Sequence, residues 1–101
     1  MENLKRFYIN GEWVDPISDR AMEVTNPATE ETIGSVALGN AKDVDSAVAA
    51  ANAAFDEFSQ TSKLDRLDLL KSVMVITRRR LEDLAQAMRM EMGAPLTMAR
   101  S

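Results

Sequence analysis

The sequence has 101 residues and a formal net charge of −4, and 46% of its residues are hydrophobic, a composition typical of a globular chain. The mildly acidic balance predicts neither a nucleic-acid nor a membrane partner, and no apolar run approaches the roughly 20 residues of a membrane-spanning helix. Cysteine and histidine are absent, which excludes a disulfide, a thiol nucleophile and an imidazole base within these residues. No apolar secretory segment opens the sequence, so we expect a cytoplasmic protein.

Short strands are expected in the first third of the chain. Residues 7–9 and 12–14 flank Asn10-Gly11, whose residues tolerate positive φ and suit the type I′ turn of a hairpin. A second pair of strands is expected at 21–25 and 32–37, with turn-forming residues between them. An isolated hairpin is marginal in water, so these strands need another element to pack on, and we expect Trp13 to pack against the helices.

The apolar period changes from two to 3.6 near residue 41, which predicts helices in the rest of the chain. Two capping-box patterns mark helix starts, Asn40 with Asp43 and Ser62 with Asp65. Helices are expected at about 41–60, 63–79 and 81–92. Gly93 suits the end of the third helix, and Pro95 suits the first turn of a fourth, truncated helix from residue 95.

The second predicted helix is apolar on two sides, which predicts that it lies between two partners. One stripe contains Leu67, Leu70 and Met74, and the other contains Leu69, Val73 and Ile76. Met88 and Met92 lie on the apolar face of the next helix and are expected to fill a core. These surfaces and the short last element lead us to expect that the sequence is a fragment of a larger protein.

Several segments of the sequence, taken in their order along the chain, are similar to segments of a known protein family. They are FYINGEWV at 7–14, VTNPATEE at 24–31, DVDSAVAAA at 43–51 and EMGAP at 91–95. In this order and spacing they resemble the amino-terminal part of the NAD(P)-dependent aldehyde dehydrogenase superfamily. The second segment is similar to the family's "NPATGE", with glutamate in place of the glycine, and the last is similar to its "ETGKP", with methionine and alanine substituted.

The resemblance implies an α/β fold in which a β-hairpin and short strands precede three helices. Residues 1–101 would be the amino-terminal part of a Rossmann-type cofactor-binding domain. The full-length protein would oxidise an aldehyde to a carboxylic acid with NAD or NADP, through a cysteine thiolate, hydride transfer and a glutamate-activated water. The family's catalytic and cofactor-binding residues lie downstream of position 101, so this chain alone would be structural and non-catalytic. Its partners would be the remainder of the same polypeptide, an aldehyde substrate, and further copies in a homodimer or homotetramer.

One site follows from the resemblance. Many members bind a monovalent cation through backbone carbonyls just before the "NP" turn, which corresponds here to Val24 and Thr25. The alternative is that these are ordinary strand and turn residues. The arginines at 78–80 are interpreted as a solvated helix end, and the adjacent carboxylates at 30–31 and 56–57 as solvated charges rather than an acid/base pair.

Two other interpretations remain open. The chain could be a stand-alone helical protein-interaction module that uses its apolar helix faces for docking. It could also be the inert product of a split gene. The identity of the aldehyde, the choice between NAD and NADP, and the oligomeric state cannot be read from these residues.

Overall fold

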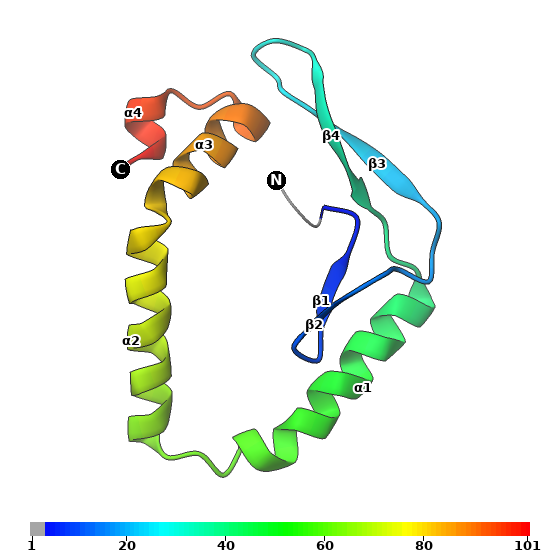
Figure 1. The fold of residues 1–101 in the computed structure, drawn as a ribbon, viewed down its shortest axis with the longest axis vertical. Helices are drawn as coiled ribbons and strands as arrows, with labels where there is room; N and C mark the ends of the chain where they lie inside the picture. Colours follow the sequence, from blue (N-terminus) through cyan, green and yellow to red (C-terminus); the bar gives the residue numbers. More distant parts are fainter. Residues whose placement is uncertain (1–3) are drawn as a thin grey trace. The chain divides into compact units, whose positions relative to one another are not determined.

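The computed structural model describes residues 4–101, and these residues form four strands and four helices (Figure 1). The chain divides into two compact units. The first contains the chain up to Val24 together with Gly34–Gln60, and the second contains Thr25–Ile33 and Thr61–Ser101. The α/β class expected from the sequence is confirmed.

The first unit begins with a two-stranded antiparallel hairpin. Strand β1 (Phe7–Ile9) pairs with β2 (Glu12–Val14) in the register that places Tyr8 opposite Trp13. Asn10 and Gly11 have φ angles of 55° and 78°, so both central residues of the turn adopt the left-handed conformation that a type I′ turn requires. The predicted hairpin and its turn are therefore confirmed.

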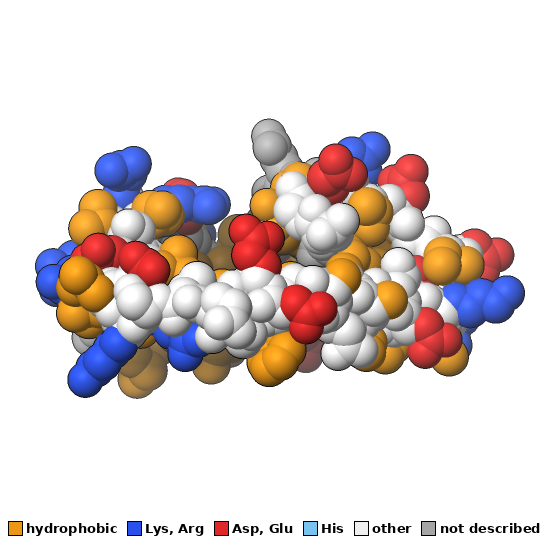
Figure 2. Space-filling view, turned by 90° about the horizontal axis from the view of Figure 1, so that it is seen from below, with side chains coloured by type: hydrophobic (Ala, Val, Ile, Leu, Met, Phe, Trp, Pro, Cys, Tyr) orange, Lys and Arg blue, Asp and Glu red, His pale blue; other side chains and the backbone are white. Residues whose placement is uncertain are grey.

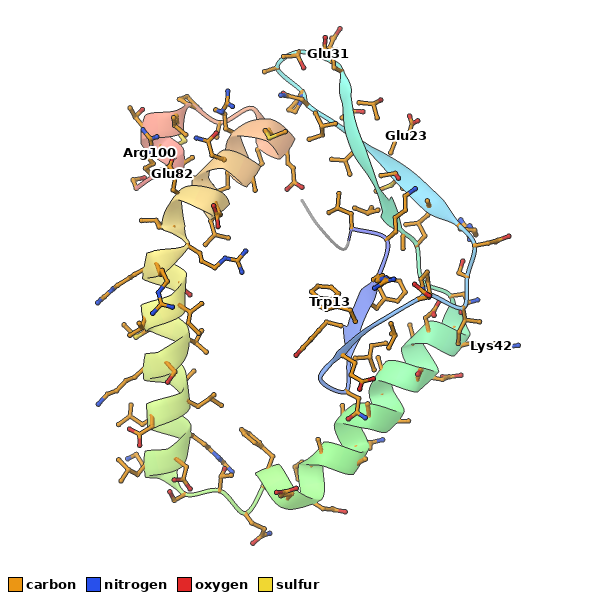
Figure 3. The ribbon with its side chains drawn as sticks, in the orientation of Figure 1. Trp13, Glu23, Glu31, Lys42, Glu82 and Arg100 are labelled. Carbon is orange, nitrogen blue, oxygen red and sulfur yellow. The ribbon has the colours of Figure 1, made fainter. Side chains whose placement is uncertain are left out.

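Trp13 packs on the aromatic ring opposite it in the hairpin. Its ring contacts the Tyr8 ring edge-on, with centroids 5.2 Å apart, and half of its surface remains exposed (Figure 3). The expectation that Trp13 packs against the helices stays a prediction.

A second sheet is formed by β3 (Ala21–Thr25) and β4 (Thr32–Ala37), with the bounds that the sequence predicts. Helix α1 (Ala41–Phe58) follows after a reciprocal capping box, in which Asn40 Oδ1 accepts from the Asp43 N–H at 3.0 Å. This helix ends two residues before the predicted position 60, because the N–H of Gln60 bonds to the carbonyl of Glu57 in a tighter turn.

The second unit contains the remaining helices. Helix α2 (Lys63–Arg79) starts with the predicted capping box of Ser62 and Asp65, and α3 (Leu81–Met92) ends at Gly93, whose φ is 72°. Helix α4 (Leu96–Ala99) begins one residue later than predicted, because Pro95 has a ψ of 139° and caps the helix from outside. No helix among the described residues is long and apolar enough to span a membrane.

Very little of the described chain is buried. Ala85 and Ala99 are the buried hydrophobic residues, at 0% and 7% exposure, and they belong to the paired helices α3 and α4. Met88 and Met92 are 38% and 65% exposed, so the prediction that they fill a core is not met by these residues. Figure 2 shows hydrophobic side chains at the surface among the charged ones, and the apolar helix faces are uncovered.

Candidate functional site

The predicted cation ligands Val24 and Thr25 are the last two residues of strand β3. Val24 is half-buried and Thr25 is exposed. Backbone carbonyl oxygens are hard, neutral donors that suit a monovalent cation, so the donor chemistry at this strand end fits such an ion. Among the described residues no cluster of acidic side chains could hold a metal ion by itself.

A closely bonded turn follows Thr25 directly. The N–H of Asn26 donates to the carbonyl of Glu31 at 2.9 Å, and the Asn26 carbonyl accepts from the N–H of Glu30 at 2.7 Å. The Asn26 side chain also accepts from the N–H of Ala28 at 2.9 Å, which is the local bond expected of an asparagine in a turn. The turn thus has a defined shape set by its own hydrogen bonds.

Glu30 occupies the left-handed region in this turn, with φ of 61°. Glutamate rarely adopts this conformation, because its Cβ crowds the following carbonyl oxygen. The family pattern has glycine at the corresponding position. The glutamate in place of the motif's glycine is therefore the feature of the sequence that indicates a strained backbone at this position.

The end of α3 lies against the same turn. A Cβ placed on Gly93 would lie 3.3 Å from Pro27 Cγ, and 3.5 Å from both the Cβ and the backbone nitrogen of Ala28. The turn therefore covers the Gly93 Cα closely. The sequence predicts Gly93 only as the end of a helix, because no local pattern places it beside residues more than sixty positions away.

Asp43 has a second structural role, which its capping pattern does not predict: it binds backbone N–H groups of a distant loop. Its carboxylate accepts hydrogen bonds from the Ile17 N–H at 2.7 Å, the Ser18 N–H at 3.3 Å and the Asn40 N–H at 3.0 Å. The residue is 6% exposed. The Ile17 bond is the largest of the causes that hold the pKa of Asp43 below its ordinary value. Asp43 therefore joins the loop after β2 to the start of α1.

Two further sequence features concern anion and cofactor binding, the arginines at 78–80 and the glycines. Arg78 and Arg79 lie in the last turn of α2, as predicted for a charged helix end, and Arg80 pairs with Asp83 at 3.5 Å. The four glycines of the sequence, at 11, 34, 39 and 93, are too far apart to form the G-x-G of a dinucleotide-binding turn. The glycine spacing of this sequence therefore does not provide that motif.

Comparison with known proteins gives a consistent result. The sequence model described as the aldehyde dehydrogenase family matches residues 13–101. A 3-succinoylsemialdehyde-pyridine dehydrogenase of a Pseudomonas species is 48% identical over 96 residues, which are 95% of this chain and 20% of that protein.

Solved structures agree with the sequence match. An aldehyde dehydrogenase mutant of Pseudomonas syringae, in complex with NAD+ and octanal, superposes with a TM-score of 0.96 at 45% identity, covering 98% of this chain and 20% of its own. The betaine aldehyde dehydrogenase of Staphylococcus aureus, in complex with NAD+, superposes with a TM-score of 0.88 at 27% identity, covering 96% of this chain and 20% of its own.

The strands and helices thus have the fold of the amino-terminal, Rossmann-type part of these structures. The chain belongs to the aldehyde dehydrogenase family. It spans about a fifth of the length of the relatives that it matches.

Proposed function

We propose that this chain is the amino-terminal part of the cofactor-binding domain of an aldehyde dehydrogenase, which oxidises an aldehyde to a carboxylic acid. The observation that carries the proposal is the superposition, at a TM-score of 0.96, on a relative solved with NAD+ and octanal. The complete protein would be cytoplasmic and would assemble as a homodimer or homotetramer. NAD or NADP would supply the hydride acceptor when bound.

Within that protein the role of these 101 residues is structural. The sequence contains no cysteine to supply a thiolate, and its glycine spacing does not form a phosphate-binding turn. What these residues do supply is a set of rigid local structures, because capping boxes fix the starts of α1 and α2 and Asp43 ties a loop to the first of them. Such local rigidity is what a scaffold for a cofactor site requires.

We also propose that the carbonyl oxygens of Val24 and Thr25 bind a monovalent cation. The proposal is supported by their place at the end of β3 and by the hydrogen-bonded turn that follows them. Since backbone atoms would provide the ligands, side-chain replacement at these two positions should change cation affinity little. A displacement of the end of β3 should change the cation affinity more, because it moves the carbonyl oxygens themselves.

The activity is tested with the complete natural polypeptide that contains these residues. It is incubated with aliphatic and aromatic aldehydes and with NAD or NADP, and reduced cofactor is measured by its absorbance. We expect formation of reduced cofactor that depends on the aldehyde, together with one equivalent of carboxylic acid. Absence of both products with every aldehyde would count against the enzyme proposal.

A second candidate function is favoured by one observation, the exposed apolar face of α2. Among its residues Leu64 and Leu70 are 64% and 61% exposed, as expected of a stand-alone interaction module. Mass and sedimentation measurements on the natural product separate the two functions. A multidomain subunit in dimers or tetramers supports the enzyme, whereas a cooperatively folding 11.2 kDa species supports the module.

A further inference from the structure

Gly93 combines two properties that no other glycine of the described chain has together. It ends α3 with a left-handed φ of 72°, and its N–H donates to the Arg89 carbonyl at 3.0 Å. It also lies under the turn after β3, where an added Cβ would approach Pro27 Cγ to 3.3 Å. Gly11 shares the positive φ, at 78°, but an added Cβ there has no neighbour within 4 Å.

The contact at Pro27 affects the whole turn. The backbone N–H and carbonyl of Asn26 are both bonded within the turn, to Glu31 and Glu30, and the Asn26 side chain holds Ala28. A bonded loop of this kind shifts as a unit when one of its residues is displaced. Asn26 is joined directly to Thr25, so a displacement of Pro27 moves the peptide group that carries a proposed cation ligand.

We infer that Gly93 is a positioning residue for the cation at the end of β3. This inference rests on the proposed cation role of Val24 and Thr25. Gly93 touches no ion itself. Because Gly93 has no side chain, the turn after β3 packs directly on the end of α3. This packing holds the turn in place, and the turn holds the carbonyl oxygen of Thr25 in place. A cation whose ligands are main-chain carbonyls depends on such backbone placement more than on side-chain identity.

The test uses the complete polypeptide with the substitution Gly93→Ala. The melting temperature is measured while KCl or NaCl replaces choline chloride at constant ionic strength. Its rise with cation concentration is fitted to the relation for a ligand that binds only the folded state, which gives the dissociation constant of the cation. Gly11→Ala is the matched control, because it introduces the same left-handed alanine where nothing is crowded. Pro27→Ala, alone and combined with Gly93→Ala, removes the Cγ atom that the new methyl would meet.

We expect Gly93→Ala to raise the dissociation constant of the cation about tenfold, equivalent to about 1.4 kcal/mol. Gly11→Ala should lower the melting temperature without changing that dissociation constant. In the Pro27→Ala background, Gly93→Ala should have a much smaller effect, because the crowded atom is gone. This double-mutant comparison separates crowding from general destabilisation.

Two results would overturn the inference, and they have different consequences for the proposed cation site. If the wild type shows a cation-dependent shift and Gly93→Ala keeps the wild-type dissociation constant, Gly93 has no positioning role and the cation assignment stands. If the wild type shows no shift with either cation, the cation assignment fails and the role of Gly93 in it fails as well.

Discussion

Glu30 is the residue with the least favourable backbone conformation in the turn after β3. Its φ of 61° lies in the left-handed region, where a side chain with a Cβ costs roughly 1–2 kcal/mol relative to the right-handed region. The surrounding hydrogen bonds, from Glu30 to Asn26 and from Asn26 to Glu31, hold it there. The turn therefore keeps its shape at a local energetic cost.

Replacement of this residue should recover part of that cost. We expect Glu30→Gly to stabilise the protein by about 0.5–1 kcal/mol, since the strain released exceeds the extra chain entropy of glycine. Thermal unfolding measures the effect as a higher melting temperature. Glu31→Gly is the control, because Glu31 does not have a positive φ and should lose stability. Equal effects of the two substitutions would argue against strain at Glu30.

Asp43 gives a pH-dependent prediction. Its carboxylate accepts from the N–H groups of Ile17, Asn40 and Ser18, and these bonds lower its pKa. A lowered pKa stabilises the folded state above the ordinary aspartate value of about 4, and this stabilisation is lost as pH falls through the lowered pKa. Asp43→Asn should lower the melting temperature at neutral pH and flatten its dependence on pH in the acid range.

Asp65 is the matched control for that experiment. It completes the capping box of α2 through Ser62 in the same way, with its pKa lowered chiefly by the Ser62 N–H, but it bonds no distant loop. Asp65→Asn should therefore lower the melting temperature less than Asp43→Asn. If the two substitutions lower it equally, the bonds to Ile17 and Ser18 contribute nothing measurable.

At the scale of elements, α4 depends on α3. Four residues are too few for a helix that stands alone, and α4 is connected to α3 by the ion pair of Arg100 with Glu82 (Figure 3). The Arg100 guanidinium donates to the Glu82 carboxylate at 2.7 and 2.9 Å. That contact, followed by the Gln86 side chain, lowers the pKa of Glu82 to about 2. The pair therefore stays ionised until the pH approaches that value.

Breaking this pair should free α4 without unfolding the protein. We expect Glu82→Gln to accelerate amide hydrogen exchange at residues 96–101 while the melting temperature changes little, because exposed ion pairs contribute little to global stability. Asp83→Asn, which breaks only the Arg80 pair next to the start of α3, should leave exchange in α4 unchanged. Unchanged exchange after Glu82→Gln would mean that other contacts hold α4.

The elements differ in how well the sequence predicts them. The strands at 21–25 and 32–37 and the helices at 63–79 and 81–92 are predicted at their observed bounds, because their signals are local: turn residues, capping boxes and a C-terminal glycine. The loop bonds of Asp43 and the contact of Gly93 with Pro27 are not predicted. Both join residues distant in sequence, and no local pattern records such pairs.

At the scale of the whole molecule, the main feature is uncovered apolar surface. All eight large apolar side chains of α2 are at least 45% exposed: Leu64, Leu67, Leu69, Leu70, Val73, Met74, Val75 and Ile76. The sequence predicts these faces correctly from their spacing but places partners against them, as it does for Met88 and Met92. Periodicity indicates which side of a helix is apolar, but it does not indicate what lies against that side, and in the structure these side chains are exposed.

The exposed face of α2 allows a test of the proposal that these residues belong to a longer polypeptide. Leu70→Ala should have little effect on the isolated 101-residue polypeptide, where Leu70 is 61% exposed. In the complete polypeptide the same substitution should destabilise by about 2 kcal/mol or more if the face is buried there. Melting temperatures of both forms provide the comparison, with Asp68→Ala as a surface control. Insensitivity of the complete polypeptide would support an open docking face instead.

The Tyr8–Trp13 pair in the hairpin also gives the chain a built-in optical probe. All five aromatic residues, at positions 7, 8, 13, 55 and 58, belong to the first compact unit, and the second unit has none. In the isolated chain, tryptophan fluorescence and near-ultraviolet circular dichroism therefore report on the hairpin unit alone. Far-ultraviolet circular dichroism at the same time follows the helices, including α2 and α3. Comparing the two signals during denaturation shows directly whether the units unfold together or one after the other.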